Sequence, residues 1–188
     1  MTEAEKRLLS ILARISYHYS PTPTFRLASG KMSQYYVDCK TTTLTPEGLV
    51  LTGQVIFERI RGLPVQGVGG LEFGAIPMAL SASIHAFQQG ENIRPFVVRK
   101  QPKDRGLKKA IEGQLHEGDR VVVLEDVVTT GASSLLAVER LREAGIEVDH
   151  VLAIIDRDEG GTEAIANAGL ELESIFTLTD LHHALSGS

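Results

Sequence analysis

The chain has 188 residues, of which 43% are hydrophobic and 23% are charged, and its net charge is −5 at pH 7. These values predict one globular domain with a sizeable core, and they exclude a disordered or fibrous protein. The acidic balance argues against a nucleic-acid binder, and the apolar runs are too short for a membrane span. The single cysteine, Cys39, excludes an internal disulfide and a cysteine-based zinc cluster. We therefore expect a cytoplasmic enzyme or regulator.

The predicted elements alternate between helices and strands along most of the chain. Apolar spacing predicts a first helix over 3–18, whereas 25–44 is expected to be extended and turn-like with a short strand at 35–37. Thr45 as N-cap and Pro46 at the first helical position begin a helix that runs to about residue 62. Further strands are predicted at 65–68, 95–98, from 121, 148–155 and 170–178, and further helices at 74–87, from about 132 to 145, and 162–168.

This alternation predicts an α/β fold with a mostly parallel central sheet and helices on both faces. We expect a single domain over 1–188. Residues 1–44 do not follow the alternation of strands and helices well, and we expect them to form a small hood over the carboxyl edge of the sheet.

The stretch from Val121 to Ser134, VVVLEDVVTTGASS, is the most informative segment. A β-branched run ends in Glu125 and Asp126, where open α/β sheets bind their ligands. A small, hydroxyl-rich turn follows and begins a helix, whose free backbone N–H groups and dipole favour an anion. The adjacent carboxylates suit ribose hydroxyls or a magnesium ion, so the segment predicts a site for a ribose with a 5′-phosphate. The alternative is an ordinary core strand and helix, but two buried carboxylates are costly without a partner.

A second group of residues is basic. Six cationic residues between Arg99 and Lys109 stand against one acid, and this local charge suits an anionic ligand such as diphosphate. Residues 99–114 show no clear period, so we expect a mobile loop that closes over the ligand. A solvated surface loop is the alternative.

A third segment, GVGGLEFGAIPMA at residues 67–79, has glycines at a strand end and at a helix start. These glycines would let backbone N–H groups approach a phosphate closely, although a tight turn explains them equally well.

The Val121–Ser134 segment resembles the phosphoribosyl-diphosphate (PRPP) signature of type I phosphoribosyltransferases. Four other segments narrow the resemblance to orotate phosphoribosyltransferases, and they are the R-K-x-x-K loop ahead of Ile111, the G-A-I-P segment, D-R-x-E-G-G at 156–161 and F-x-L-x-S-G at 25–30. The resemblance covers Phe25 to about Gly161. Arg105 stands where the family commonly has histidine, and Ala28 stands where some members have a base-contacting lysine.

The resemblance implies an activity and a set of site residues. The reaction would be the Mg²⁺-dependent transfer of the 5-phosphoribosyl group from PRPP to N1 of orotate, giving orotidine 5′-phosphate and diphosphate in pyrimidine synthesis. The expected catalytic residues are Lys103, Asp126 and Glu125. The residues expected to bind PRPP are Arg99, Lys100, Lys103, Arg105, Glu125, Asp126, Val127, Val128, Thr129, Thr130, Gly131, Ala132 and Ser133. Those expected to bind orotate are Thr129 and Arg157.

The resemblance also implies that Mg²⁺ is held mainly through PRPP, without a dedicated protein metal site. It implies a homodimer in which the basic loop of one subunit acts on the site of the other. Without the family pattern, Arg157 would be a structural partner of Asp156 or Asp158. Two other functions stay open, a phosphoribosyltransferase for another nucleobase and a PRPP-sensing regulator on the same fold.

Overall fold

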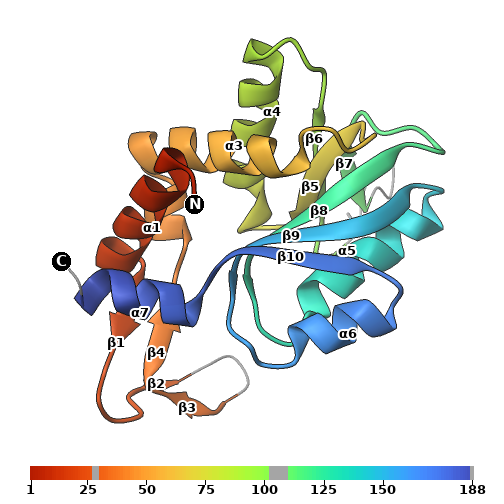
Figure 1. Cartoon of the computed structure of the whole chain (residues 1–188). Coiled ribbons are helices and arrows are strands. Elements are labelled where there is room, and N and C mark those ends of the chain that lie inside the picture. The colour runs from red at the N-terminus through yellow and green to blue at the C-terminus, as the bar shows by residue number, and fades with distance from the viewer. Residues whose placement is uncertain (27–29, 102–109, 187–188) are drawn as a thin grey trace.

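A mostly parallel sheet lies at the centre of the computed structural model, which describes residues 1–26, 30–101 and 110–186 (Figure 1). The order of its strands in the described residues is β10-β9-β8-β5-β6-β7. Neighbouring strands are parallel except for β7, which pairs antiparallel with β6 at one edge. The strands are β5 (Gly67–Leu71), β6 (Arg94–Val98), β7 (Ile111–Gly113), β8 (Arg120–Val128), β9 (Glu147–Asp156) and β10 (Glu171–Thr177).

Helices cover both faces of the sheet (Figure 1). One face carries α3 (Pro46–Ile60) and α4 (Ala75–Gln88), next to which pack α1 (Glu3–Ile15) and α7 (Leu178–Ser186). The other face carries α5 (Ala132–Glu143) and α6 (Gly161–Asn167). Successive residues of β8 alternate between these two cores, because neighbouring side chains of a strand point to opposite faces. Val122 and Leu124 belong to the α3–α4 core, whereas Val121 and Val123 belong to the α5–α6 core.

The N-terminal part of the chain lies beside the sheet and next to α7 (Figure 1). Strand β1 (Tyr17–Tyr19) pairs with β4 (Tyr35–Val37), β2 (Phe25–Arg26) pairs with β3 (Met32–Ser33), and α2 (Lys40–Thr43) follows. A ring cluster joins this part to the C-terminal helix: the Tyr17 hydroxyl lies 3.2 Å from His182 Nδ1, and the Tyr35 ring stacks on Tyr17.

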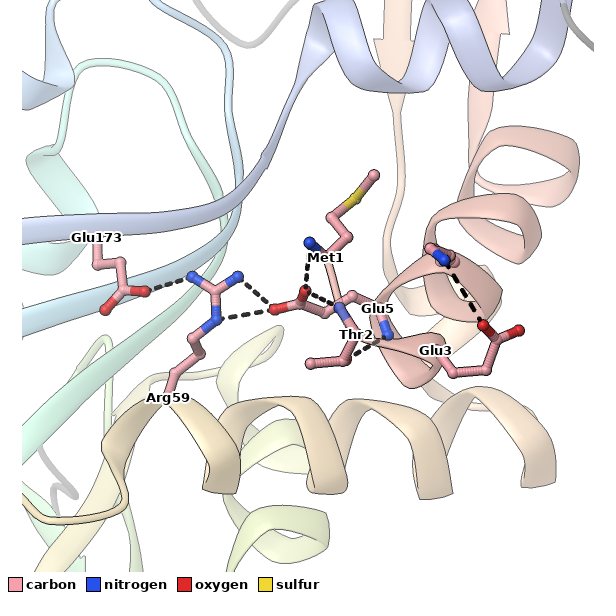
Figure 2. Close-up of polar contacts among 7 residues, drawn as sticks. Met1, Thr2, Glu3, Glu5, Arg59 and Glu173 are labelled. Atoms are coloured by element: carbon pink, nitrogen blue, oxygen red, sulfur yellow. Dashed lines mark hydrogen bonds and ion pairs between the residues drawn. The ribbon is translucent and has the colours of Figure 1, made fainter.

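An ion-pair network ties α1, α3 and β10 together (Figure 2). Arg59 on α3 binds the Glu5 carboxylate through Nε, at 2.9 Å, and through Nη2, while its Nη1 donates to Glu173 on β10. Glu5 is 3% exposed, and it also accepts the Thr2 backbone N–H in a capping box that begins α1. Because a buried carboxylate needs such partners, Arg59 fixes the N-terminal helix on the core.

The predicted fold class is confirmed, and most predicted elements are found within two residues of their expected ends. The sequence did not predict α2, α7, β7 or β1, and it gave β2 and β3 only as extended chain. The first helix ends at Ile15, three residues earlier than expected, because Tyr17–Tyr19 pairs as β1 with β4, and β5 begins two residues later than expected. In the described parts of the chain, no helix has the length and apolar character needed to cross a membrane.

Candidate active site

The turn after β8 forms a small cradle at the start of α5. Its hollow encloses about 50 Å³ and is lined by Glu125, Val127, Val128, Thr129, Thr130, Gly131, Ala132, Ser133 and Ser134. Gly131 has φ +77°, a conformation that glycine adopts without strain, and it is the residue before the first helical turn. The first bond of that helix runs from the Leu135 N–H to the Gly131 carbonyl. The preceding N–H groups therefore have no carbonyl of their own helix to bind and can bind an anion.

The two carboxylates of β8 point to opposite faces of the sheet. Glu125 lies on the α5 face, where its Oε2 accepts a hydrogen bond from Ser134 Oγ at 3.0 Å. Burial, and then the charge of Asp126, raises the pKa of Glu125 to about 7. Near neutral pH, Glu125 is therefore partly protonated. The two carboxylates still interact with each other, because Asp126 contributes to the raised pKa of Glu125.

Asp126 lies on the α4 face in a confined position. Its Oδ1 accepts the Val127 N–H at 3.0 Å, and its carboxylate packs on the backbone of Gly74, the residue that precedes α4. A Cβ atom at Gly74 would lie 2.5–2.6 Å from three atoms of this carboxylate, so only glycine leaves room for it. On its other side, Lys40 Nζ lies 3.7 Å from Asp126 Oδ2.

Arg157 lies beside the cradle because β9 is the parallel neighbour of β8. The Arg157 N–H donates to the Val128 carbonyl at 3.0 Å, and the side chain is only 7% exposed. Its Nη2 pairs with Glu159 at 2.7 Å, and its buried Nε has no hydrogen-bond partner among the described residues. The ion-pair partner of Arg157 is thus Glu159, not Asp156 or Asp158, and part of the guanidinium's donor capacity is left for a ligand.

The basic loop begins at the end of β6. Arg99 pairs with Glu112 at 3.7 Å, and its N–H donates to the Ala110 carbonyl, which closes the base of the loop. The backbone of Lys100 is held from two sides, since its N–H donates to Glu72 Oε1 at 2.9 Å and its carbonyl accepts from Arg140 Nη2 at 3.0 Å. Within the described residues, no hydrogen bond or ion pair joins Arg99 or Lys100 to the cradle. Lys103, Arg105 and Ala28 lie outside the described residues.

Three residues that contact the site or its basic loop were missed in the sequence, Lys40, Glu72 and Ser134. Ser134 is the second of two serines at a helix start, and the helical turn directs it toward the sheet. Gly74 was noticed as part of a phosphate-binding turn, but its neighbour is a carboxylate. Nothing in the local pattern of D-C-K at 38–40 indicates that Lys40 reaches residue 126.

The donors present are compatible with a magnesium ion that is held largely by ligand oxygens. Mg²⁺ prefers carboxylate, phosphate and water oxygens and commonly keeps only one or two protein ligands. Glu125 lines the cradle and Asp126 follows it on the strand, and both carboxylates are of that type. Among the described residues, no group of three or more His, Cys, Asp or Glu side chains comes together as a metal site.

The site combines two features of one strand in a parallel sheet. The strand ends in an acid pair, and the turn after it presents free backbone N–H groups at a helix start. These features define a class of proteins that bind phosphorylated ribose. No family model matches the chain. Orotate phosphoribosyltransferase from Aquifex aeolicus is 46% identical over 96% of this chain and 98% of its own length, and that from Sorangium cellulosum is 42% identical over 93% and 91%. The crystal structure of Mycobacterium tuberculosis orotate phosphoribosyltransferase in complex with PRPP matches with a TM-score of 0.79, at 35% identity, over 95% of this chain and 99% of that one. The chain belongs to the orotate phosphoribosyltransferase family.

Proposed function

We propose that the chain transfers the 5-phosphoribosyl group of PRPP to N1 of orotate, giving orotidine 5′-phosphate and diphosphate. The observation that carries the proposal is the cradle of residues 127–134 beside Glu125 and Asp126. In this assignment the backbone N–H groups and hydroxyls of Thr129, Thr130 and Ser133 bind the 5′-phosphate. The two carboxylates accept hydrogen bonds from the ribose hydroxyls, one from each face of the strand end. These contacts to the phosphate and the ribose hydroxyls hold the sugar in place while the bond from C1′ to diphosphate breaks.

Arg157 and Thr129 are proposed to recognise the base. Orotate carries a carboxylate and two carbonyl acceptors, and a guanidinium offers planar, directional donors to such groups. The buried, unpartnered Nε of Arg157 supports this role, because a ligand acceptor would satisfy it. The hydrogen bond between the Arg157 N–H and the Val128 carbonyl keeps the base position next to the sugar position.

The basic loop is proposed to bind the departing diphosphate through Arg99, Lys100, Lys103 and Arg105. Cationic donors stabilise the charge that grows on the diphosphate oxygens as C1′ becomes oxocarbenium-like. Mg²⁺, when bound through PRPP oxygens, would supply further charge neutralisation at the same group. Glu72 and Arg140 support this role for the loop, because they hold the backbone of Lys100 and so fix where the loop begins.

The working form is proposed to be a homodimer in which the basic loop of each subunit acts on the partner's site. Apolar side chains gather on α4 and the start of α3, where Val50, Leu80, Ile84 and Phe87 are 48–77% exposed. Such a face suits an interface with a second copy.

Residues 1–44 are proposed to act as a hood over the base site, within a single domain of 1–188. We also propose a cytoplasmic location, where a buried free thiol such as Cys39 stays reduced.

Orotate consumption tests the proposed activity directly. The absorbance of orotate should change when PRPP and Mg²⁺ are added, whereas uracil, adenine and hypoxanthine should give no PRPP-dependent product. D126N and R157A should each abolish most of the rate. A chain that converts another base faster than orotate would refute the assignment.

The K103A variant tests the role of the basic loop. It should lower kcat far more than it weakens orotate binding, and an unchanged kcat would remove the loop from the mechanism.

Mixing two inactive variants tests the action of the loop in trans. K100A lacks a loop cation, and D126N lacks a ribose acceptor. If the loop serves the partner's site, random exchange gives mixed dimers with one intact site each, and about a quarter of the wild-type activity should return. Complementation should disappear in an F87D background, because a carboxylate on the proposed interface should keep the subunits apart.

A further inference from the structure

We infer that Lys40 is a positioning residue for the transfer reaction, because it holds the Asp126 carboxylate in the geometry that receives the ribose. This inference rests on the proposed function and extends it to a residue outside the cradle, the basic loop and the base site. Lys40 comes from α2, more than eighty positions before Asp126 in the chain.

Lys40 is itself held firmly. Its Nζ lies 2.6 Å from Asp38 Oδ1, and the same oxygen accepts the Lys40 backbone N–H at 3.1 Å. Asp38 therefore fixes both ends of the lysine, and the ammonium group is directed at Asp126 Oδ2, 3.7 Å away. The ion pairs with Asp38 and Asp126 raise the pKa of Lys40 against the opposing effect of burial, which is the largest single influence, so the group stays charged.

The contact between α2 and β8 involves the backbone of Asp126 as well as its side chain. The Cys39 thiol is fully buried and donates to the Asp126 carbonyl at 3.6 Å, within reach for a sulfur donor. Ser16 Oγ lies 2.6 Å from Thr42 Oγ1 inside the same buried region, which anchors α2 to the end of α1. Because backbone and carboxylate are both contacted, α2 fixes the position of Asp126 and not only its charge.

The remaining sides of the Asp126 carboxylate are also occupied. Gly74 closes one side by direct packing, and the Val127 N–H binds Oδ1. The side chain is 16% exposed. A ribose hydroxyl can approach only through this residual opening, and Lys40 sets which way the carboxylate faces it.

Loss of the ammonium group should act mainly on PRPP. Without Lys40, Asp126 keeps its acidic neighbour Glu125 but loses the ammonium group beside Oδ2, and with it the contact that directs this oxygen. We expect K40M to raise KM for PRPP by roughly tenfold, as suits a lost charge-assisted contact at a partly exposed site. KM for orotate should change by less than about twofold, because Arg157 and Thr129 are untouched.

A double-mutant cycle with four proteins tests the inference: wild type, K40M, D126N and K40M/D126N. PRPP affinity is measured by isothermal titration, and kcat and KM by orotate absorbance. If Lys40 acts through Asp126, adding K40M to D126N should weaken PRPP binding little further. K40R should restore most of the wild-type KM for PRPP. K6M, at an exposed lysine that pairs with Glu3, is the matched control and should behave as wild type.

The outcomes separate the two proposals. A wild-type protein that binds PRPP but does not consume orotate refutes the proposed function, and the titration still tests Lys40. An active wild type with an unchanged PRPP KM in K40M, or a full K40M penalty in the D126N background, overturns the inference. A melting temperature of K40M equal to that of wild type is expected. If K40M unfolds, K40R and D38N carry the test, and D38N should raise KM for PRPP in the same direction.

Discussion

Gly74→Ala is a sharp test of the site because it should separate activity from stability. The Gly74 backbone has φ −62° and ψ −37°, helical values that alanine adopts without strain. Alanine gains up to about 1 kcal/mol of helix propensity over glycine, and the preference for glycine over alanine at an N-cap opposes it by a similar amount. The local stability terms therefore nearly cancel.

The effect on the site should be large. The new Cβ would lie 2.5 Å from the nearest carboxylate atom of Asp126, whereas ordinary contact begins at 3.4 Å, so the carboxylate must withdraw by about 0.9 Å. A misplacement near 1 Å in a catalytic arrangement costs on the order of 100-fold in rate. We expect kcat/KM for PRPP to fall by roughly that factor.

The assay compares orotate turnover and thermal melting of G74A with those of wild type. E58A is the control, because Glu58 is an exposed α3 residue that contacts Gln54 and lies away from the cradle. G74A with near wild-type kcat/KM would refute the close packing of Asp126 on the α4 start. A G74A protein that melts far below wild type would contradict the cancellation argued above.

Three further predictions concern stability and pH. The folded pKa of Glu125 is about 7, above its ordinary value of 4.5. The native state therefore binds more protons than the unfolded state between these pH values, and stability falls as pH rises through that window. At pH 8 the free energy of unfolding of E125Q should therefore exceed that of wild type by at most a few kcal/mol, and near pH 4.5 the two should differ little. E125Q should lose PRPP turnover, and equal stability of the two proteins at pH 8 would contradict the burial argument. R59M leaves the Glu5 carboxylate buried without its partner and should cost roughly 2–4 kcal/mol in denaturant unfolding, while E173A, at the exposed end, should cost less than about 1 kcal/mol. G131A forces a Cβ into a left-handed conformation 3.2 Å from Ile165, and it should cost about 1–2 kcal/mol and weaken PRPP binding; calorimetry that finds neither loss would contradict the strain at the cradle.

The regular elements were predictable because their patterns are local. Thr45 and Pro46 begin α3 as predicted, and the Thr45 hydroxyl accepts the Gly48 N–H at 3.1 Å. The β-branched run ahead of Glu125 predicted β8. The glycine pair at 69–70 was interpreted as the end of a strand, but both glycines lie inside β5, where a Cβ would meet the Phe96 and Leu124 carbonyls. Local sequence gives no sign of such a close neighbour.

The elements that were missed depend on distant partners. Strand β7 has three residues and exists by pairing with β6, and α2 has four residues held by buried contacts of Thr42 and Cys39. Helix α7 packs Leu181 into the core next to α1. Short segments such as β7 and α2 have little propensity of their own, so tertiary packing decides their structure.

The site was predictable in its parts but not in its geometry. The sequence indicated the acid doublet and the cradle, and the strand period explains why Glu125 and Asp126 face opposite sides. Their surroundings required the fold, since Ser134 comes from α5, Gly74 from the start of α4 and Lys40 from α2. The roles of Lys103 and Arg105 stay predictions.

A crystal structure with PRPP bound tests the central claim most directly. The 5′-phosphate should lie in the hollow of residues 127–134, with its oxygens within hydrogen-bond distance of the N–H groups that precede the first bond of α5. The ribose hydroxyls should contact Glu125 and Asp126. A phosphate bound anywhere else, with this hollow left to water, would contradict the account.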